Sequence, residues 1–292
     1  MLFRSSQASA LARELGVSAV TARLLASRGL GLDDARRFLA PRLEDFHDPM
    51  RLTDLPVAVD RILGAIARRE RIAIHGDYDV DGVTSTVIMR RCLELLGADV
   101  THFIPERFRD GYGLQPATID RLHADGARVI VSVDCGIRAG EAALRAASLG
   151  IDLIITDHHE PDEELPKALA VLNPKRHDCP YPDKNLAGVG VALKLVQALC
   201  DRAGRSEWLP GFIKVAAIGT LADVVPLVGE NRVIAKLGLG MLSRGPHKVG
   251  LRALLEVCGL TGREIDSYHI GFVLAPRVNA ADRKSTRLNS SH

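Results

Sequence analysis

From residue 71 onward, short apolar runs alternate with longer amphipathic segments. The apolar runs cover residues 72–74, 100–104, 129–133, 153–156 and 170–172. Between them, apolar positions recur at helical spacing within residues 83–96, 116–124 and 138–148. This β-α-β alternation predicts an α/β fold, a parallel sheet flanked by helices on both faces. In such sheets, ligands bind beyond the carboxyl ends of the strands.

The two ends of the chain have a helical pattern instead. Residues 8–40 space Ala, Leu and Val as a helix would and are followed by a loop through Pro49 and Pro56, while residues after 185 form a series of amphipathic segments. We expect an N-terminal helical segment at 1–50, a catalytic domain at 51–230 and a helical connector at 231–281. Residues 282–292 contain one large apolar side chain, Leu288, and no periodicity. We interpret them as a non-native tail, with a disordered native tail as the alternative.

Composition limits the class of protein. The 292 residues are 47% hydrophobic, enough for a buried core, and the net charge of +2 favours no particular partner. The five cysteines include no Cys-x-x-Cys pair, which argues against a disulfide framework or a structural zinc site and favours a cytoplasmic protein. The N-terminus is interrupted by Arg4, Arg13 and Glu14, so we expect neither a signal peptide nor a membrane span.

A dense acidic motif follows the first apolar run and precedes a helix. It reads HGDYDVDG and contains His75, Asp77, Asp79 and Asp81. Three carboxylates this close together would repel one another, so a bound cation is the economical interpretation. An EF-hand calcium loop is disfavoured, because its twelfth position requires Glu and is Ile88 here, and because an apolar strand rather than a helix precedes the motif. A solvated acidic turn without function remains as the alternative.

Two more strands end in residues that bind metals. Asp134 follows residues 129–133, and the triplet Asp157, His158 and His159 follows residues 153–156. One such residue alone is more often a helix cap or a surface group, but three strand ends at one sheet edge point to a shared metal site. Asp223 is a fourth candidate, although alone it would more often be a helix-end residue.

Carboxylates and imidazoles without thiolates select Mn²⁺ or Mg²⁺ over zinc. Five or more such ligands can hold two ions, the arrangement that hydrolyses phosphoesters. A histidine that is not a ligand could position substrate or donate a proton. Cys135 adjoins Asp134, but no partner base is evident, so we assign it to packing rather than to nucleophilic catalysis.

With these residues in view, the chain resembles the DHH phosphoesterases, and within them the branch of single-stranded-DNA exonucleases. The matching segments, from about Phe46 to Ala281, are HGDYDVDGVTST, IPERFRDGYGL, SVDCGI, the triplet DHH, NLAGVGVALKL, GTLADVVPL and APRVNAA. Several ordered motifs make the resemblance specific. It implies a two-metal site, usually with manganese, that degrades single-stranded DNA from the 5′ end to 5′-mononucleotides in recombination and repair. The expected protein partners are single-strand-binding protein or a repair helicase.

The resemblance also implies a role for each matching residue. The implied metal ligands are His75, Asp79, Asp81, Asp134, His158 and Asp223. The implied catalytic residues are His159, which would contact the scissile phosphate, together with Asp157 and Asp77, the latter as a ligand or a supporting group. The implied substrate-binding residues are Arg107, Arg277 and Asn279.

The chain departs from the family pattern near its end. The family continues after Ala281 with Gly-Arg, where this chain has Asp282 and Arg283, and it has a second substrate-binding domain and an OB-fold beyond this point. We therefore expect a C-terminally truncated chain. Two other functions stay open: a DHH phosphodiesterase for short oligonucleotides, cyclic dinucleotides or pyrophosphate, and a binding relative without metals.

Overall fold

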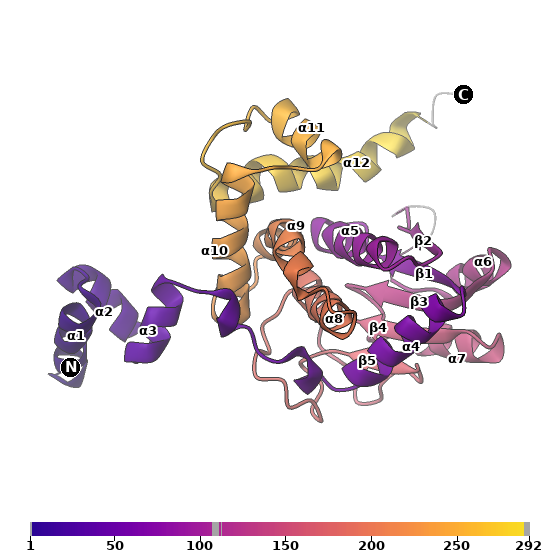
Figure 1. Ribbon diagram of the computed structural model, residues 1–292, viewed down its shortest axis with the longest axis horizontal. Helices are drawn as coiled ribbons and strands as arrows, with labels where there is room; N and C mark the ends of the chain where they lie inside the picture. The colour runs from indigo at the N-terminus through magenta and orange to yellow at the C-terminus, as the bar shows by residue number, and fades with distance from the viewer. Residues whose placement is uncertain (1, 107–110, 112, 289–292) are drawn as a thin grey trace. The chain divides into compact units, whose positions relative to one another are not determined.

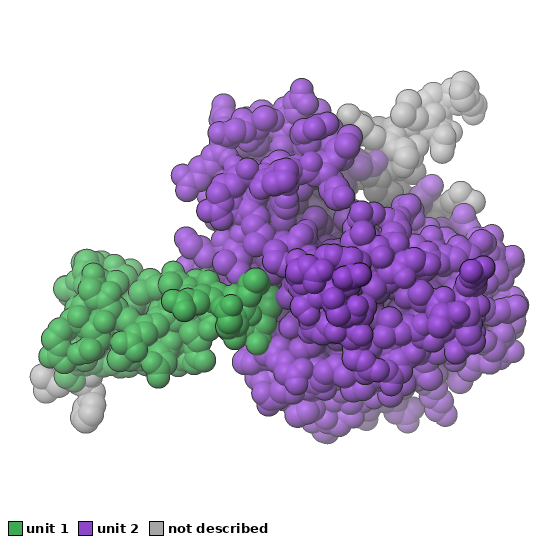
Figure 2. Space-filling view, in the orientation of Figure 1, with its two compact units in different colours: residues 1–46 green, residues 47–292 purple. Residues whose placement is uncertain are grey.

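The computed structural model describes residues 2–106, 111 and 113–288, which form two compact units, Met1–Phe46 and His47–His292 (Figure 2). The first unit contains α1 (Leu2–Leu15), α2 (Ala19–Ser27), α3 (Leu32–Leu39) and the 3₁₀ turn η1 (Leu43–Asp45). Its own small core includes Leu11, Leu25 and Ala35. The N-terminal helical segment expected at 1–50 thus contains three helices. The boundary between the two units lies after Phe46, slightly before the boundary expected after residue 50.

The second unit is built on a five-stranded sheet (Figure 1). Its strands are β1 (Arg71–Gly76), β2 (Val100–Phe103), β3 (Ala127–Val133), β4 (Asp152–Thr156) and β5 (Ala170–Leu172). They lie in the order β2-β1-β3-β4-β5, and every neighbouring pair is parallel. Alternate side chains of β3 are buried on opposite faces, so both faces must be covered. The predicted parallel α/β fold is confirmed.

Helices cover the two faces of the sheet. One face packs α4 (Leu55–Ala67), α5 (Val80–Leu95) and α8 (Gly188–Arg202), and the other packs α6 (Pro116–Ala124) and α7 (Gly140–Ser148). The chain goes from β1 outward to β2 and then returns to β3 on the other side of β1. The carboxyl ends of β1 and β3 thus form the switch point at which doubly wound sheets bind ligands.

The sequence predicts a loop through Pro49 and Pro56, but residues 49–67 are largely helical. The 3₁₀ turn η2 (Pro49–Arg51) and helix α4 occupy this segment, and α4 buries Leu55, Val59 and Ile62 at helical spacing. Pro56 lies in the first turn of α4, where its missing N–H removes no helical hydrogen bond. A proline that indicated a loop therefore marks a helix start.

The C-terminal part of the second unit is helical, as predicted. It contains η3 (Ser206–Trp208), α9 (Leu209–Ala222), α10 (Gly229–Arg244), α11 (Val249–Val257), the π-helix η4 (His269–Leu274) and α12 (Ala275–Leu288). The last helical stretch begins after Asp266, whose carboxylate accepts the backbone N–H of His269 at 3.1 Å. It then continues as α12 to Leu288, into the segment for which no element was expected. No helix among the described residues has the length and apolar character needed to cross a membrane.

Candidate metal centre

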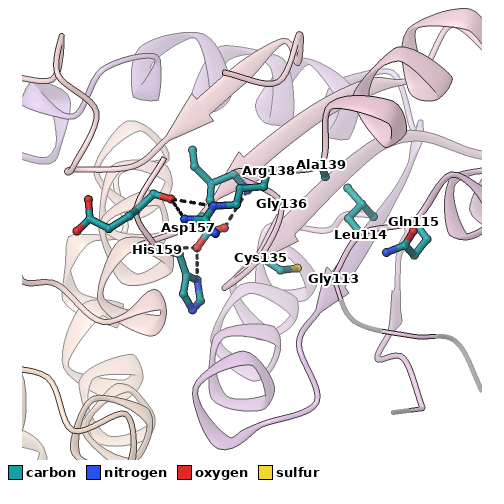
Figure 3. Close-up of a pocket in the computed structure, with 11 residues that line it drawn as sticks. Gly113, Leu114, Gln115, Cys135, Gly136, Arg138, Ala139, Asp157 and His159 are labelled. Carbon is teal, nitrogen blue, oxygen red and sulfur yellow. Dashed lines mark hydrogen bonds and ion pairs between the residues drawn. The ribbon is translucent and has the colours of Figure 1, made fainter. Parts of the chain in front are cut away.

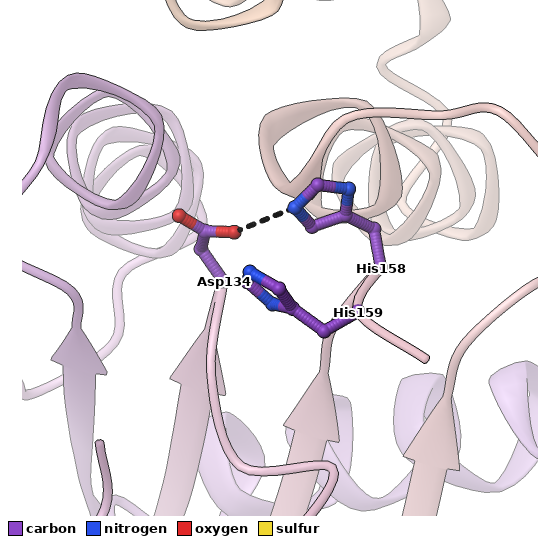
Figure 4. A group of neighbouring side chains, drawn as sticks. All are labelled: Asp134, His158 and His159. Carbon is purple, nitrogen blue, oxygen red and sulfur yellow. Dashed lines mark ion pairs between the residues drawn. The ribbon is translucent and has the colours of Figure 1, made fainter. Parts of the chain in front are cut away.

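The predicted acidic and histidine residues gather at the carboxyl edge of the sheet. Asp77 follows β1, Asp134 follows β3, and Asp157 follows β4, so neighbouring parallel strands deliver the three clusters to one place. In Figure 4, Asp134, His158 and His159 lie together above the strand ends. The side chains that bring ligand atoms within 4.8 Å of one another form three overlapping groups. These are Asp134 with His158 and His159, Asp81 with His158 and Asp223, and Asp77 with Asp79 and Asp134.

The start of α5 positions the acidic motif. Asp79 is the N-cap of this helix, and its Oδ1 accepts the backbone N–H of Gly82 at 2.9 Å. Asp81 lies in the first turn and is almost fully buried. Its two oxygens accept the backbone N–H groups of Gly188 and Val189 at 2.7 and 2.8 Å, so the N-terminus of α8 holds this carboxylate.

His158 lies at the centre of the carboxylates. Its Nε2 is 3.3 Å from Asp134 Oδ1, 3.7 Å from Asp223 Oδ2 and 4.0 Å from Asp81 Oδ2. Burial, together with the neighbouring His159, lowers the pKa of His158 to about 4. The ring is therefore neutral at physiological pH, and a neutral imidazole has one ring nitrogen with a lone pair that can bind a metal.

The carboxylates themselves are poorly neutralised. Burial raises the pKa of Asp81 and of Asp134 well above the usual carboxyl range, and repulsion from neighbouring aspartates adds to the effect. Burial also raises the pKa of Asp77 and of Asp223 to about 6. Among the described residues, Asp134 Oδ1 and Asp223 Oδ2 are buried and accept no hydrogen bond. A divalent cation would supply the missing positive charge, so this oxygen-rich donor set with one neutral imidazole fits Mn²⁺ or Mg²⁺.

Three glycines give these carboxylates room, a role that was not predicted. A Cβ on Gly188 would lie 2.2 Å from Asp134 Oδ1, and one on Gly219 would lie 2.9 Å from Asp81 Oδ1. A Cβ on Gly82 would lie 2.6 Å from the Cβ of Asp77. Any side chain at these positions would displace a carboxylate. All three glycines fall inside the motif segments, but Gly188 and Gly219 meet carboxylates from distant parts of the chain, and only Gly82 has a neighbour, Asp77, within its own motif.

Asp157 and His159 form a separate unit beside the metal groups. The Oδ1 atom of Asp157 accepts His159 Nδ1–H at 2.7 Å, and its Oδ2 accepts the backbone N–H of Ile137 at 2.9 Å. The hydrogen bond that His159 donates to Asp157 raises the pKa of His159. Burial alone would raise the pKa of Asp157, but this hydrogen bond keeps it below its usual value. A half-exposed imidazole held in this way can, when it is protonated, donate to a phosphate oxygen. Asp157 is thus placed to orient His159, and the catalytic roles of both residues stay predictions.

The other predicted site residues lie apart from the three groups. His75 is fully buried at the end of β1, where its ring stacks on Phe103 with centroids 5.8 Å apart. Arg277 and Asn279 are exposed on α12, and Arg277 Nη1 donates to the carbonyl of Val273 at 2.7 Å. Arg107 falls outside the described residues. The ligand role of His75 and the phosphate roles of the other three stay predictions.

The sequence of this chain is similar to the sequences of known proteins. The family model described as "DHH family, N-terminal domain" matches residues 71–220. The single-stranded-DNA-specific exonuclease RecJ of Bacillus subtilis is 44% identical over 274 residues, which are 94% of this chain and 34% of that protein. The Escherichia coli RecJ is 38% identical over 272 residues, 89% of this chain and 47% of that protein.

A solved structure of a relative has the same fold. RecJ from Thermus thermophilus in complex with Mn²⁺ superimposes with a TM-score of 0.80 at 34% identity, over 96% of this chain and 39% of that one. The chain thus spans less than half the length of each of these relatives. The family match covers more than half of the 292 residues and includes the start of α5 and all three strand ends that carry the site. The chain therefore belongs to the DHH family of phosphoesterases.

Proposed function

We propose that this chain carries the active site of a divalent-metal-dependent exonuclease that hydrolyses single-stranded DNA from its 5′ end to 5′-mononucleotides. The observation that carries the proposal is His158 Nε2 within 4.0 Å of carboxylate oxygens from Asp81, Asp134 and Asp223. The RecJ names of the relatives at 38–44% identity supply the substrate and the reaction. We infer a role in DNA recombination and repair in the cytoplasm, with single-strand-binding protein or a repair helicase as partner.

The metal would be Mn²⁺ or Mg²⁺, bound as a pair of ions by the carboxylates of Asp77, Asp79, Asp81, Asp134 and Asp223 with His158. Such ions, when bound, activate water and neutralise charge on the phosphate. The residues of the chain do the rest. His159 donates a hydrogen bond to a phosphate oxygen, Asp157 fixes the ring that donates it, and α8 holds the carboxylate of Asp81 in place.

The test is a comparison of substrates in Mn²⁺. Purified protein is given a long single strand labelled at either end, the matching blunt duplex, a dinucleotide and pyrophosphate. We expect 5′-labelled mononucleotide to appear first from the single strand, with the duplex resistant. Faster turnover of the dinucleotide or of pyrophosphate would instead establish the small-substrate phosphodiesterase, and early loss of the 3′ label would refute the polarity.

A further inference from the structure

A cavity of about 420 Å³ adjoins the metal centre on the side of α6 and α7. It opens between the segment that precedes α6, the loop from β3 to α7, and the segment after β4 (Figure 3). Asp157 and His159 form one of its walls. Because His159 also belongs to a metal-ligand group with Asp134 and His158, the cavity and the metal centre share this wall.

The interior of the cavity is apolar. Leu114 and Ile137 are buried, Ala139 is partly buried, and the backbone of Gly113 and Gly136 completes the lining. The charged group at the rim, Arg138, already donates to the carbonyl of Glu160 and lies 3.2 Å from Asp162 Oδ1. An apolar volume of this size, with polar groups at its edge, suits a flat organic ring better than a second phosphate.

The loop that forms the floor is held in one conformation. Gly136 has a φ of +112°, and a Cβ there would lie 2.8 Å from Ser132 Oγ and 3.2 Å from Ile155 Cγ2. Ser132 Oγ donates to the carbonyl of Cys135 at 2.8 Å. Asp157 binds both the backbone of Ile137 and the ring of His159, so one carboxylate fixes the cavity floor relative to the phosphate-binding ring. The cavity is thus preformed.

We propose that this cavity receives the base of a nucleotide flanking the scissile phosphate, with Leu114, Ile137 and Ala139 against the base. The inference rests on the proposed function. A phosphate held at His159 carries a nucleoside on either side, and the shared wall directs one of them into the cavity. A base lodged there cannot pair with a complementary strand. The cavity would therefore be a source of selectivity for single strands at the DHH domain itself.

The test is an abasic scan of binding in chelator, where no strand is cut. Affinity is measured for a set of single strands that each lack one base, at successive positions from the 5′ end. Wild-type protein should lose affinity by at least about fivefold when one particular base near the 5′ end is missing, the low end of what one base contact contributes. Loss of any other base should matter less. Equal affinity for the whole set would overturn the proposal.

Two variants assign the effect to the cavity. Ala139→Phe fills the cavity, and Ala168→Phe is the matched control, because Ala168 is also partly buried against the same apolar cluster but does not line the cavity. We expect Ala139→Phe to bind the intact strand as weakly as the critical abasic strand, while Ala168→Phe keeps the wild-type difference. A full abasic penalty in a folded Ala139→Phe protein would refute the assignment. Should Ala139→Phe not fold, the abasic penalty is measured on the smaller substitution Ala139→Leu and compared with the wild-type scan, and a full penalty in that variant refutes the assignment.

Cleavage in Mn²⁺, measured with the same strands, separates this inference from the proposed function. Base-dependent binding without cleavage would leave the cavity assigned and reject the exonuclease. Cleavage from the 5′ end with equal affinity for intact and abasic strands would keep the exonuclease and reject the cavity as a base site.

Discussion

Asp134 is the residue whose environment most requires a cation. It is almost fully buried, its neighbours raise its pKa, and its backbone has a φ of +61°, a conformation that costs free energy for a residue other than glycine. Such strain persists where the surrounding structure imposes it, and it concentrates at functional sites. Two features of Asp134 are thus unfavourable, the burial of its carboxylate and its left-handed backbone, and together they place that carboxylate beside His158.

Asp134→Asn should separate the metal requirement from stability. Asparagine tolerates the left-handed backbone and removes one buried, repelling charge, so the metal-free variant should melt no lower than wild type. Wild type should gain about 2.7 kcal/mol of stability at a Mn²⁺ concentration one hundred times its dissociation constant, and the variant should lose most of that gain. Thermal melts with and without Mn²⁺ measure both. The exposed Asp125, changed to Asn, is the control, and an undiminished metal effect in Asp134→Asn would count against the centre.

Asp157 should affect turnover but not metal binding. In Asp157→Asn, the new side-chain NH₂ group faces a donor, either the backbone N–H of Ile137 or the ring N–H of His159, so one of these hydrogen bonds is lost. His159 then loses its orientation, and we expect turnover to decrease about a hundredfold. Mn²⁺ affinity, from calorimetric titration, should stay at the wild-type value. Because the two residues act together, Asp157→Asn with His159→Gln should be little worse than His159→Gln alone. Loss of Mn²⁺ binding in Asp157→Asn would instead make Asp157 a ligand.

The sequence could predict Asp77, Asp134 and His158 because each follows an apolar run closely, and parallel strands bring such positions to one edge. The resemblance alone implies a catalytic role for Asp157, and the sequence could not predict that its carboxylate binds the backbone of Ile137, twenty residues away. The glycines at 188 and 219 were similarly beyond reach, since each is required only by a carboxylate contributed from another element.

Among the elements, α5 and α8 jointly position the centre. The first turn of α5 supplies Asp79 and Asp81, and the N-terminus of α8 binds the Asp81 carboxylate through two backbone N–H groups. The positive end of the α8 dipole stabilises that negative charge. The close approach of the α8 N-terminus to Asp134 depends on Gly188, the first residue of α8.

Gly188→Ala, a change in α8, should therefore displace the Asp134 carboxylate from the metal centre. The new methyl group would overlap Asp134 Oδ1, and overpacking of this kind costs about 1–3 kcal/mol. We expect a lower melting temperature together with weakened Mn²⁺ binding. Gly211→Ala in α9 is the matched control, because a Cβ there meets nothing within 4 Å and alanine favours the helix. Wild-type Mn²⁺ binding in Gly188→Ala would show that Asp134 can move without consequence.

Element prediction succeeded where periodicity was strong and failed where end signals were misjudged. All five strands and the helices between them were predicted from alternating apolar runs. The missing helix was α4, because Pro56 indicated a loop although a proline in the first turn favours a helix. The helical turns that lead into η4 begin just after Asp266, whose carboxylate accepts the backbone N–H of His269, a local hydrogen bond that the apolar pattern does not indicate.

At the scale of the whole second unit, a buried polar network joins distant segments. Lys194 Nζ donates to Glu230 Oε1 at 2.9 Å and to the carbonyl of His47 at 2.8 Å, and Tyr181 Oη donates to Glu230 Oε2 at 2.5 Å. Both charged side chains are only 1% exposed. The network connects the first residue of the unit with α8 and α10, so it ties the chain entry to the helices behind the metal centre.

Breaking one partner of this network should be costly. Lys194→Met leaves the Glu230 carboxylate buried and unpaired, which we expect to destabilise the unit by about 3–5 kcal/mol. The double variant Lys194→Met with Glu230→Leu should recover part of that loss. Arg90→Met, which breaks an exposed pair with Glu94, should cost less than about 1 kcal/mol. Urea denaturation followed by the fluorescence of Trp208, the single tryptophan, reports on this unit; additive effects of Lys194 and Glu230 would contradict the coupling.

The proposed function requires that the residues at three strand ends, together with Asp223, hold the catalytic metal. Crystals soaked in Mn²⁺ and measured at the manganese absorption edge test it most directly, because anomalous peaks locate the ions without reference to activity. We expect peaks among His158 Nε2 and the carboxylates of Asp81, Asp134 and Asp223, with a second ion about 4 Å from the first. Absence of a peak at these residues in crystals of protein that cleaves single strands in Mn²⁺ would contradict it.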